Sequence, residues 1–402
     1  MRFIKQLSVQ GLLSFPPDME PLDLKPLNIL IGPNGSGKSN LIEVFELLSS
    51  APTDFADTLR KGGGINEWLW KGTKNSRYAN LKLITDFGSV GHLFRKKKPL
   101  VYCLDFDSVI NRVEIRRESI EFEGINSPHG ILYNNVEGNS RIRTDSDHPV
   151  GLKLKDNLDF RVLKDIESNK SILSQIKDPF NYPEVFELGN YFDEMVIFRD
   201  WTFGRDSPPR RVHPPDLPTD RLLPSCENLA HILGELILND SAFERFNKLL
   251  KRFLPNFKRI TPGLSGGGVQ FFLHETGLDT PIPATRISDG TLRFLAIIAT
   301  LLVPKPPTLV CIDEPELGLH PDAVALIGEL LIEASKRMQL IVTTHSDVLV
   351  SAMDLYPENI ITCERWGAGT VFQRLDANSL KKWLKEYSLG ELWQMGELGA
   401  NP

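Results

Sequence analysis

The sequence predicts an α/β fold with a central, mostly parallel sheet, an antiparallel β lobe and a helical lobe. Three observations lead to this prediction. Near the N-terminus an apolar run at 27–31 passes into a glycine-rich loop and then into a segment of helical periodicity. From about 79 to 151, polar and apolar residues alternate as in antiparallel strands. After residue 284, helical segments alternate with short apolar runs, which is typical of buried parallel strands.

The first elements are expected in the order strand, strand, loop and helix. The strand-like runs are "FIKQLSVQG" and "LNILI", and the second feeds into "GPNGSGKSNLIEVFELLSS". In that segment Leu41, Val44 and Leu48 recur at helical spacing. Residues 60–75, with glycines and two tryptophans, are expected to form an irregular loop.

The middle of the chain is patterned less evenly. The strands of 79–151 are expected to be joined by turns containing Gly, Asn and Asp. Residues 152–225 are weakly patterned and proline-rich around "DSPPRRVHPPDLPTDRLLP", so we expect long surface connections there. Helical periodicity returns in "NLAHILGELILNDSAFERFNKLLKRFLP".

Composition excludes several classes of protein. The chain has 402 residues, of which 41% are hydrophobic, and this supports a large buried core. A net charge of −6 gives no global positive field, so any contact with nucleic acid must be a local patch. The four cysteines form no CxxC pair, which argues against a disulfide framework. No apolar run reaches the roughly 18 residues of a membrane span, so we expect a cytoplasmic protein without membrane contact.

The glycine-rich loop carries the most specific motif. Its letters "GPNGSGKS" fit the pattern G-x-x-x-x-G-K-[ST] in full. Successive backbone N–H groups of such a loop turn towards phosphates, and the following helix adds a favourable dipole. Lys38 is expected to reach the β- and γ-phosphates of ATP, and the Ser39 hydroxyl to bind Mg²⁺. The predicted nucleotide-binding residues here are Gly32, Pro33, Asn34, Gly35, Ser36, Gly37, Lys38, Ser39 and Asn40.

Two adjacent carboxylates, Asp313 and Glu314, follow the apolar run "TLVCI". Such a pair is costly at a strand end unless a cation or a reacting water lies beside it. We therefore predict that Asp313 binds Mg²⁺ and that Glu314 acts as general base on the attacking water. An ordinary strand-to-helix cap could carry the same two letters, but the phosphate loop favours the catalytic interpretation.

A histidine, His345, ends another apolar run in "IVTTHS". A neutral imidazole near the γ-phosphate of ATP could hydrogen-bond that phosphate and sense its loss. A lone histidine at a strand end is often only a satisfied polar residue. The order phosphate loop, acidic pair, histidine favours a catalytic role for His345.

Some dimeric ATPases have a signature loop, with letters such as LSGGQ, by which one subunit binds the nucleotide held by the other. Two segments of this chain are candidates for such a loop. The letters "LSGGGVQ" at 264–270 look like such a signature, but "VQFFL" continues as a strand rather than a helix. We therefore predict a glycine hairpin at this point. In "RISDGTLRFLAIIATLL" Ser288 is placed to cap a helix, and Gly290 permits close backbone approach. Ser288 is thus the predicted signature residue.

These motifs together resemble the ABC-type ATPases of the SMC and RecF-like branch, in particular small prokaryotic AAA-type ATPases related to the OLD-family ATPase domain. The resemblance is carried by "PLNILIGPNGSGKSNLIE", "RISDGTLRFLAI", "CIDEPELGLHP", "IVTTHS", "GGGINEWLWKG" and "YSLGELWQMGELG". It implies a P-loop NTPase fold of ABC-ATPase type. It also implies ATP hydrolysis by a head-to-tail dimer, in which Ser288 of one subunit completes the site formed by Lys38, Asp313 and Glu314 of the other.

The resemblance also implies a division of the chain. Residues 1–95 would form the N-terminal part of the ATPase domain, 96–235 an inserted β-rich and irregular lobe, and 236–402 a helical lobe with the C-terminal part of the ATPase domain. A TOPRIM nuclease segment, as in full OLD proteins, is not expected. Two departures stand out. Asp289 replaces a glycine that is frequent in relatives, and no glutamine between Leu41 and Ser174 supplies a Q-loop residue.

The expected partners are a second copy of the chain in the ATP state and a separate effector protein, nuclease-like or TOPRIM-like, in anti-phage defence or genome maintenance. DNA is a further candidate, through cation clusters at 95–98, at 208–216 and in "RFNKLLKRFLPNFKRI". The alternative function is a low-turnover, nucleotide-gated scaffold, in which ATP occupancy rather than hydrolysis is the signal.

Overall fold

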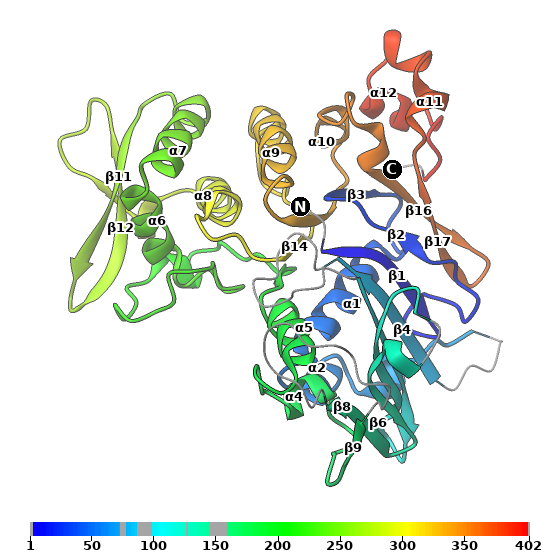
Figure 1. Ribbon diagram of the computed structural model, residues 1–402. Coiled ribbons are helices and arrows are strands. Elements are labelled where there is room, and N and C mark those ends of the chain that lie inside the picture. The colour runs from blue at the N-terminus through cyan, green and yellow to red at the C-terminus, as the bar shows by residue number, and fades with distance from the viewer. Residues whose placement is uncertain (1–2, 73–77, 87–98, 126–127, 145–158, 401–402) are drawn as a thin grey trace. The chain divides into compact units, whose positions relative to one another are not determined.

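The computed structural model describes residues 3–72, 78–86, 99–125, 128–144 and 159–400 (Figure 1). The chain forms two compact units. Unit 1 comprises Met1–Pro26, Pro33–Met195 and Cys363–Gln373, and unit 2 comprises Leu27–Gly32, Val196–Thr362 and Arg374–Pro402. The chain therefore passes from unit 2 to unit 1 within the predicted phosphate loop.

Unit 1 contains a broad antiparallel sheet. Among the described residues its strand order is β2-β1-β4-β5-β6-β7-β8-β9. The strands are β1 (Ile4–Gln10), β2 (Leu22–Asp23), β4 (Tyr78–Thr85), β5 (Leu100–Val109), β6 (Arg112–Phe122), β7 (Ile131–Val136), β8 (Asn139–Thr144) and β9 (Asp159–Leu163). Alternate residues of β5 are buried, as a sheet with one covered face requires. The antiparallel strands predicted for 79–151 are thus confirmed wherever the structure describes them.

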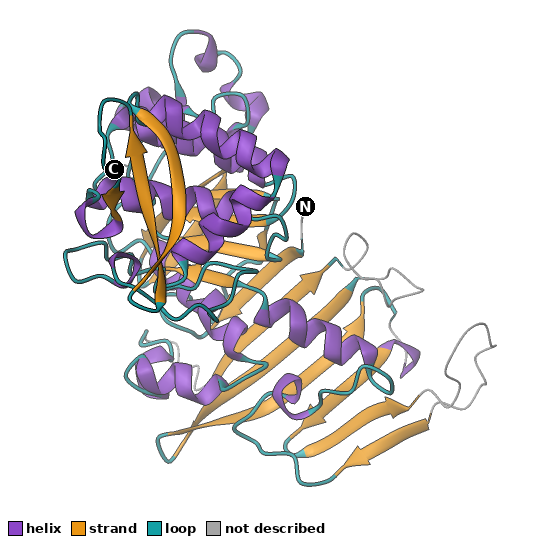
Figure 2. Ribbon diagram, turned by 90° about the vertical axis from the view of Figure 1, so that its left-hand side faces the viewer, coloured by secondary structure: helices purple, strands orange, loops and turns teal. Residues whose placement is uncertain are grey.

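Helices cover one face of this sheet (Figure 2). They are α1 (Lys38–Ser50), α2 (Phe55–Lys61), α4 (Ile172–Gln175) and α5 (Pro183–Asp193), and a short α3 (Ile65–Trp68) follows α2. Aromatic rings join the layers: Phe55 of α2 meets Phe106 of β5 edge-on, and Tyr102 of β5 meets Phe192 of α5 in the same way. The apolar stripe predicted for the helix after the glycine loop is buried in α1.

Unit 2 contains the parallel sheet. Its strands lie in the order β10-β14-β15-β3-β16, with bounds Val196–Phe198, Leu309–Ile312, Gln339–Thr343, Leu27–Ile31 and Ile360–Trp366. Each neighbouring pair is parallel. The residues of β3, β14 and β15 are buried throughout, which explains why these segments are unbroken apolar runs rather than alternating ones. From Cys363 the chain belongs to unit 1, where β16 ends and β17 (Gly369–Arg374) follows.

The remaining elements of unit 2 are mainly helices. They are α6 (Leu229–Leu238), α7 (Asp240–Phe253), α8 (Asp289–Leu302), α9 (Pro321–Ala334), α10 (Asp347–Ser351), α11 (Ala377–Leu380) and α12 (Leu389–Gln394). A small antiparallel sheet of β11 (Phe257–Ser265), β12 (Gly268–Glu275) and β13 (Ile282–Pro283) packs against α6 and α7. The predicted combination of parallel sheet, antiparallel lobe and helical lobe is therefore confirmed.

Two local predictions are wrong. Residues 152–225 contain more than surface connections, because α5 and β10 lie in this stretch. The three-residue β10 is too short to show a period, and it exists because it pairs with β14. Residues 60–75 include the end of α2 and all of α3, so this segment is not an irregular loop throughout. No helix in the described part of the chain has the length and apolar character needed to cross a bilayer.

Candidate nucleotide site

The phosphate loop leaves the carboxyl end of β3 and enters α1 at Lys38. Its three glycines adopt positive φ angles: 149° at Gly32, 76° at Gly35 and 104° at Gly37. Glycine is required at position 37 for two reasons. Its φ angle is positive, and a Cβ there would lie 2.1 Å from the Thr370 Oγ1 atom. The loop thus has a backbone path that other residues would strain.

Thr370 of β17 braces this loop within unit 1. Its hydroxyl donates a 2.8 Å hydrogen bond to the carbonyl oxygen of Ser36 and lies 2.8 Å from the Ser14 hydroxyl. The Thr370 amide donates to the Ser14 carbonyl oxygen at 2.9 Å. The sequence prediction missed this brace, since Thr370 lies far along the chain from the loop.

Lys38 is buried, with only 5% of its surface exposed. Its ammonium donates to the Pro33 carbonyl oxygen at 3.0 Å, so the side chain folds back over the loop. Burial raises the pKa of the nearby Cys363 thiol, against the opposing influence of the Lys38 charge. Ser39 and Asn40 follow in the first turn of α1 and are half-buried.

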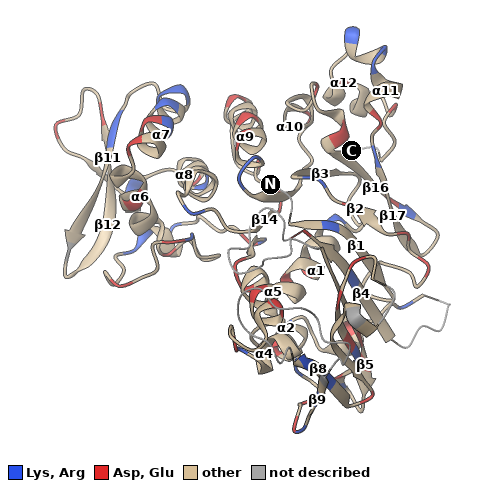
Figure 3. Ribbon diagram, in the orientation of Figure 1, with Lys and Arg blue, Asp and Glu red and all other residues tan. Residues whose placement is uncertain are grey.

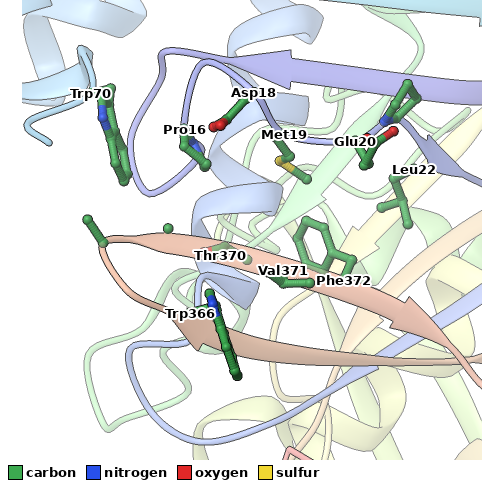
Figure 4. A pocket seen from close by; sticks show the side chains of 13 residues that line it. Pro16, Asp18, Met19, Glu20, Leu22, Trp70, Trp366, Thr370, Val371 and Phe372 are labelled. Carbon is green, nitrogen blue, oxygen red and sulfur yellow. The ribbon is translucent and has the colours of Figure 1, made fainter. Parts of the chain in front are cut away.

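A separate cavity of about 490 Å³ lies in unit 1 (Figure 4). Its walls come from the segment after β1 and from β17, with Trp70 and Trp366 at one end. Thr370 also lines this cavity, whereas none of the predicted nucleotide-binding residues does. The cavity is therefore distinct from the candidate phosphate site.

In unit 2, Asp313 and Glu314 directly follow β14, as predicted. Thr343, the last residue of β15, holds both. Its hydroxyl donates to the Asp313 carboxylate and accepts from the Glu314 amide at 3.1 Å. The Glu314 amide also donates to the Thr343 carbonyl oxygen at 3.2 Å. Thr343 was not among the predicted site residues, although it lies only two residues before His345 in the segment "IVTTHS".

The structure brings Glu314 and His345 together. The Nε2 atom of His345 lies 3.6 Å from the Glu314 Oε1 atom, and both side chains are about 30% exposed. Glu314 has a φ of 47°, a left-handed conformation that costs a non-glycine residue about 1–3 kcal/mol. Strain of this kind persists only where the surroundings hold the residue in place, and here Thr343 does so.

Glu316 supports the backbone of His345. Its Oε1 atom accepts 2.7 Å hydrogen bonds from the Thr344 hydroxyl and from the His345 amide. Burial raises the pKa of Glu316, although these two hydrogen bonds oppose the rise. On the other side, Arg293 of α8 donates to the Glu314 carbonyl oxygen at 3.3 Å, and burial lowers its pKa.

The register of unit 2 places these residues at one edge of the parallel sheet. Ile312 pairs with Val342, and Val342 pairs with Ile29 of β3. Just beyond this level, the Thr344 amide donates to the Leu30 carbonyl oxygen at 3.1 Å. The start of the phosphate loop, the acidic pair and His345 therefore share the carboxyl edge, where ligands of open α/β sheets bind.

The two signature candidates have different structures. Residues 264–270 lie in the β11–β12 hairpin, in which Ser265 pairs with Gly268, so the predicted glycine hairpin is confirmed. Ser288 is the N-cap of α8, as predicted, and its hydroxyl accepts from the Thr291 amide at 3.1 Å. Ser288 is exposed, and the amides that begin α8 have no acceptors within the helix.

Gly290 is required by packing inside unit 2. A Cβ at this position would lie 2.9 Å from the Gly318 carbonyl oxygen, in the segment "ELGLHP". The close approach predicted for Gly290 thus involves the chain's own backbone.

The residues present suit Mg²⁺. Asp313 is half-buried at the strand end, and no Lys, Arg or His of the described residues forms an ion pair with it. Carboxylate and hydroxyl oxygens, as in Asp313 and Ser39, are the ligand types that Mg²⁺ prefers. The described residues hold no cluster of three or more His, Cys, Asp or Glu arranged for a metal.

In the cation cluster at 208–216, Arg210 is only 6% exposed and donates to five groups of the protein, so it is not free to contact DNA, whereas Arg211 is exposed. In the second cluster, Arg245 and Arg252 pair with Glu333 and Glu329 of α9. The third cluster, at 95–98, lies outside the described residues.

Comparison with known sequences gives a family and a relative. The profile of a family described as "AAA domain, putative AbiEii toxin, Type IV TA system" matches residues 27–89 and 129–351, well over half of the chain. A chromosome partition protein Smc from Aquifex aeolicus (strain VF5) is 32% identical over 126 residues. That match covers 28% of this chain and only 11% of the Smc protein.

Comparison with solved structures gives the fold. An Smc head bound to the C-winged helix domain of ScpA has a TM-score of 0.56, covering 94% of this chain and 99% of that one. An Smc head with an extended coiled coil from Pyrococcus furiosus, bound to the C-terminal domain of ScpA, has a TM-score of 0.58, with 96% and 99% covered. Both are 15% identical to this chain, so the likeness concerns the fold.

Proposed function

This chain belongs to the family described as "AAA domain, putative AbiEii toxin, Type IV TA system", and from that premise we propose that it hydrolyses ATP as an ATP-dependent dimer. It is an ABC-type ATPase of the SMC-like branch, with the fold of Smc head domains. The cycle of ATP binding and hydrolysis would control a separate effector protein or the engagement of DNA.

The observation that carries the proposal is the carboxyl edge of the parallel sheet in unit 2. The phosphate loop begins there, and Asp313, Glu314 and His345 follow the neighbouring strands. Thr343 orients the acidic pair through three hydrogen bonds, and His345 lies 3.6 Å from Glu314. A structural cap would need neither the strained Glu314 backbone nor the imidazole beside it.

Each residue has a role in this scheme. The backbone of residues 32–37 and the ammonium of Lys38 would bind the phosphates of ATP. Glu314 would accept a proton from the attacking water, and His345 would orient that water or contact the γ-phosphate. Ser39 and Asp313 would hold Mg²⁺, which neutralises phosphate charge when bound.

The second subunit would contribute its Ser288 and the N-terminus of its α8. Ser288 is exposed, and the start of α8 offers backbone N–H groups and a favourable dipole to a phosphate. Gly290 lets the segment "ELGLHP" pack directly against this turn. Both segments that would meet the partner are thus held together in one unit.

Glu314→Gln tests hydrolysis directly. We expect the rate of phosphate release to fall about 10²–10⁴-fold, because the amide cannot accept the proton. Binding of ATP should persist, since the amide keeps the shape of the side chain. The matched control is Glu329→Gln, the same change on the exposed face of α9, where it removes only a surface ion pair with Arg252. Equal rates for wild type and Glu314→Gln would contradict the assignment.

DNA engagement is supported by exposed cations in unit 2. Lys248 and Lys251 of α7 and Lys258 and Arg259 of β11 are exposed. Figure 3 marks lysine and arginine positions on α7 and β11 in blue. Replacing Lys248 and Lys251 by glutamate should weaken binding of double-stranded DNA and flatten its dependence on salt, while hydrolysis without DNA stays unchanged. Unaltered binding would exclude this face and leave the effector protein as the partner.

The low-turnover scaffold remains the alternative. It rests on two departures from related ATPases, the acid Asp289 at the start of α8 and the missing Q-loop glutamine. Asp289 is paired with Arg210. The same Glu314→Gln comparison separates the two functions. A scaffold would dimerise with ATP in wild type and variant alike, with no difference in phosphate release.

A further inference from the structure

We propose that Arg210 is the positioning residue of the signature turn, residues 284–290, and that it neutralises Asp289 so that Ser288 can approach a phosphate. This inference rests on the proposed function of Ser288. It concerns a residue 79 positions away from Asp289 in the sequence.

The guanidinium of Arg210 is enclosed by acceptors of unit 2. Its three nitrogens donate to four backbone carbonyl oxygens and one carboxylate. These are Phe203 O (3.1 Å), Gly204 O (3.1 Å), Ala284 O (3.2 Å), Ile287 O (2.6 Å) and the Asp289 carboxylate. A buried cation with this many acceptors is fixed in one orientation.

Three of these acceptors belong to the turn that presents Ser288. Ala284 and Ile287 lie before it, and Asp289 lies directly after it. The planar fork of an arginine bonds all three at once, which a lysine ammonium cannot do in the same geometry. Arg210 therefore holds the conformation of the turn from both sides of Ser288.

The charge of Asp289 also affects the approach of a phosphate to Ser288. Asp289 is the first residue of α8, and its side chain is 65% exposed. A carboxylate there favours the helix dipole but would repel a phosphate approaching Ser288. Its ion pair with the buried Arg210 offsets that repulsion.

Arg210 is itself anchored on a rigid segment. It ends a short turn that begins with Pro208 and Pro209. Three residues later His213 exchanges two backbone hydrogen bonds with Val269 of β12, at 3.1 and 2.7 Å. This segment therefore ties the β11–β12 hairpin to the signature turn.

A double-mutant cycle tests the proposal, with ATP hydrolysis and the mass of the ATP-bound species as readouts. Arg210→Met should lower both hydrolysis and ATP-dependent dimer formation about tenfold or more, and adding Asp289→Asn should restore a large part of the loss. The single Asp289→Asn variant completes the cycle. Arg211→Met, an exposed neighbour, is the matched control and should behave as wild type.

The outcomes separate positioning from mere folding. A loss in Arg210→Met that Asp289→Asn does not relieve, or hydrolysis within about twofold of wild type, would overturn the proposal. Should Arg210→Met fail to fold, Arg210→Lys decides. It keeps the charge without the fork, so wild-type dimer formation in it would also overturn the proposal. If wild type and Glu314→Gln release phosphate equally, the proposed function fails instead, and that result is visible before any Arg210 variant is measured.

Discussion

Two turns of unit 2, at 264–268 and 287–290, carry serine and glycine and have different structures. The first joins two antiparallel strands, with Gly266 and Gly267 at φ angles of 56° and 84°. The second begins α8, with Ser288 as N-cap. The letters "LSGGG" match the familiar signature better, yet only the second turn offers the N–H groups of a helix N-terminus.

The difference lies in the element that follows each turn. The first turn is followed by β12, in which Phe271 and Leu273 are buried. The second is followed by α8, a helix buried on most sides. Glycines serve separate purposes in the two places. Gly266 and Gly267 supply a left-handed hairpin turn, whereas Gly290 has an ordinary backbone and is needed for close packing. A short motif therefore identifies a phosphate contact only together with the element after it.

Among changes in these two turns, the largest effect is expected from Ser288→Arg. An arginine at the cap would remove the proposed contact to the nucleotide and block the approach of the proposed second subunit, so ATP hydrolysis should fall about 100-fold or more. Ser265→Arg is the matched change in the hairpin and should leave hydrolysis unaltered. Phosphate release measured on both variants is decisive, since a normal rate in the first and a low rate in the second would reverse the assignment.

A smaller effect is expected from Gly290→Ala. Its Cβ would lie 2.9 Å from the Gly318 carbonyl oxygen, so the turn and "ELGLHP" must move apart. We expect the free energy of unfolding to fall by about 1–3 kcal/mol, together with a loss of ATP-dependent dimer formation. Denaturant unfolding measures the change in stability, and sedimentation in the presence of ATP measures dimer formation. A variant as stable as wild type would show that the close contact is not required.

The smallest effect is expected from Gly267→Ala in the hairpin. A Cβ added at position 267 would meet no atom within 4 Å. Only the left-handed backbone would be unfavourable for alanine, and we expect it to lower the free energy of unfolding by about 1 kcal/mol. Gly267→Asn should cost less, because asparagine tolerates this conformation. Neither variant should alter ATP hydrolysis. An equal cost for Ala and Asn in denaturant unfolding would argue against a left-handed backbone at this position.

Much of the fold and of the candidate site was predictable from local sequence. The phosphate loop, the strand before Asp313 and the cap at Ser288 are each contained in a few consecutive residues with a clear local pattern. Their supports were not predictable, because each joins distant positions: Thr370 braces Ser36, and Thr343 holds Asp313 and Glu314. Pattern rules see neighbours along the chain, and these contacts exist only after folding.

Arg210 shows the same limit more sharply. In the sequence it belongs to a cation cluster, and such a cluster suggests phosphate contact from outside. In the structure it is buried and bound to the turn at Ser288, so its charge acts inside the protein. Asp289 likewise looked like an unfavourable acid at the signature. Its partner was invisible because no local pattern links the two positions.

The most direct test of the account is the mass of the ATP-bound species, measured for Glu314→Gln alone and combined with Ser288→Arg or with Ser265→Arg. Without hydrolysis, ATP should hold Glu314→Gln as a species of twice the chain mass. The account predicts that adding Ser288→Arg leaves a monomer and that adding Ser265→Arg leaves the dimer intact. A dimer that survives Ser288→Arg, or one that is lost with Ser265→Arg, would contradict it.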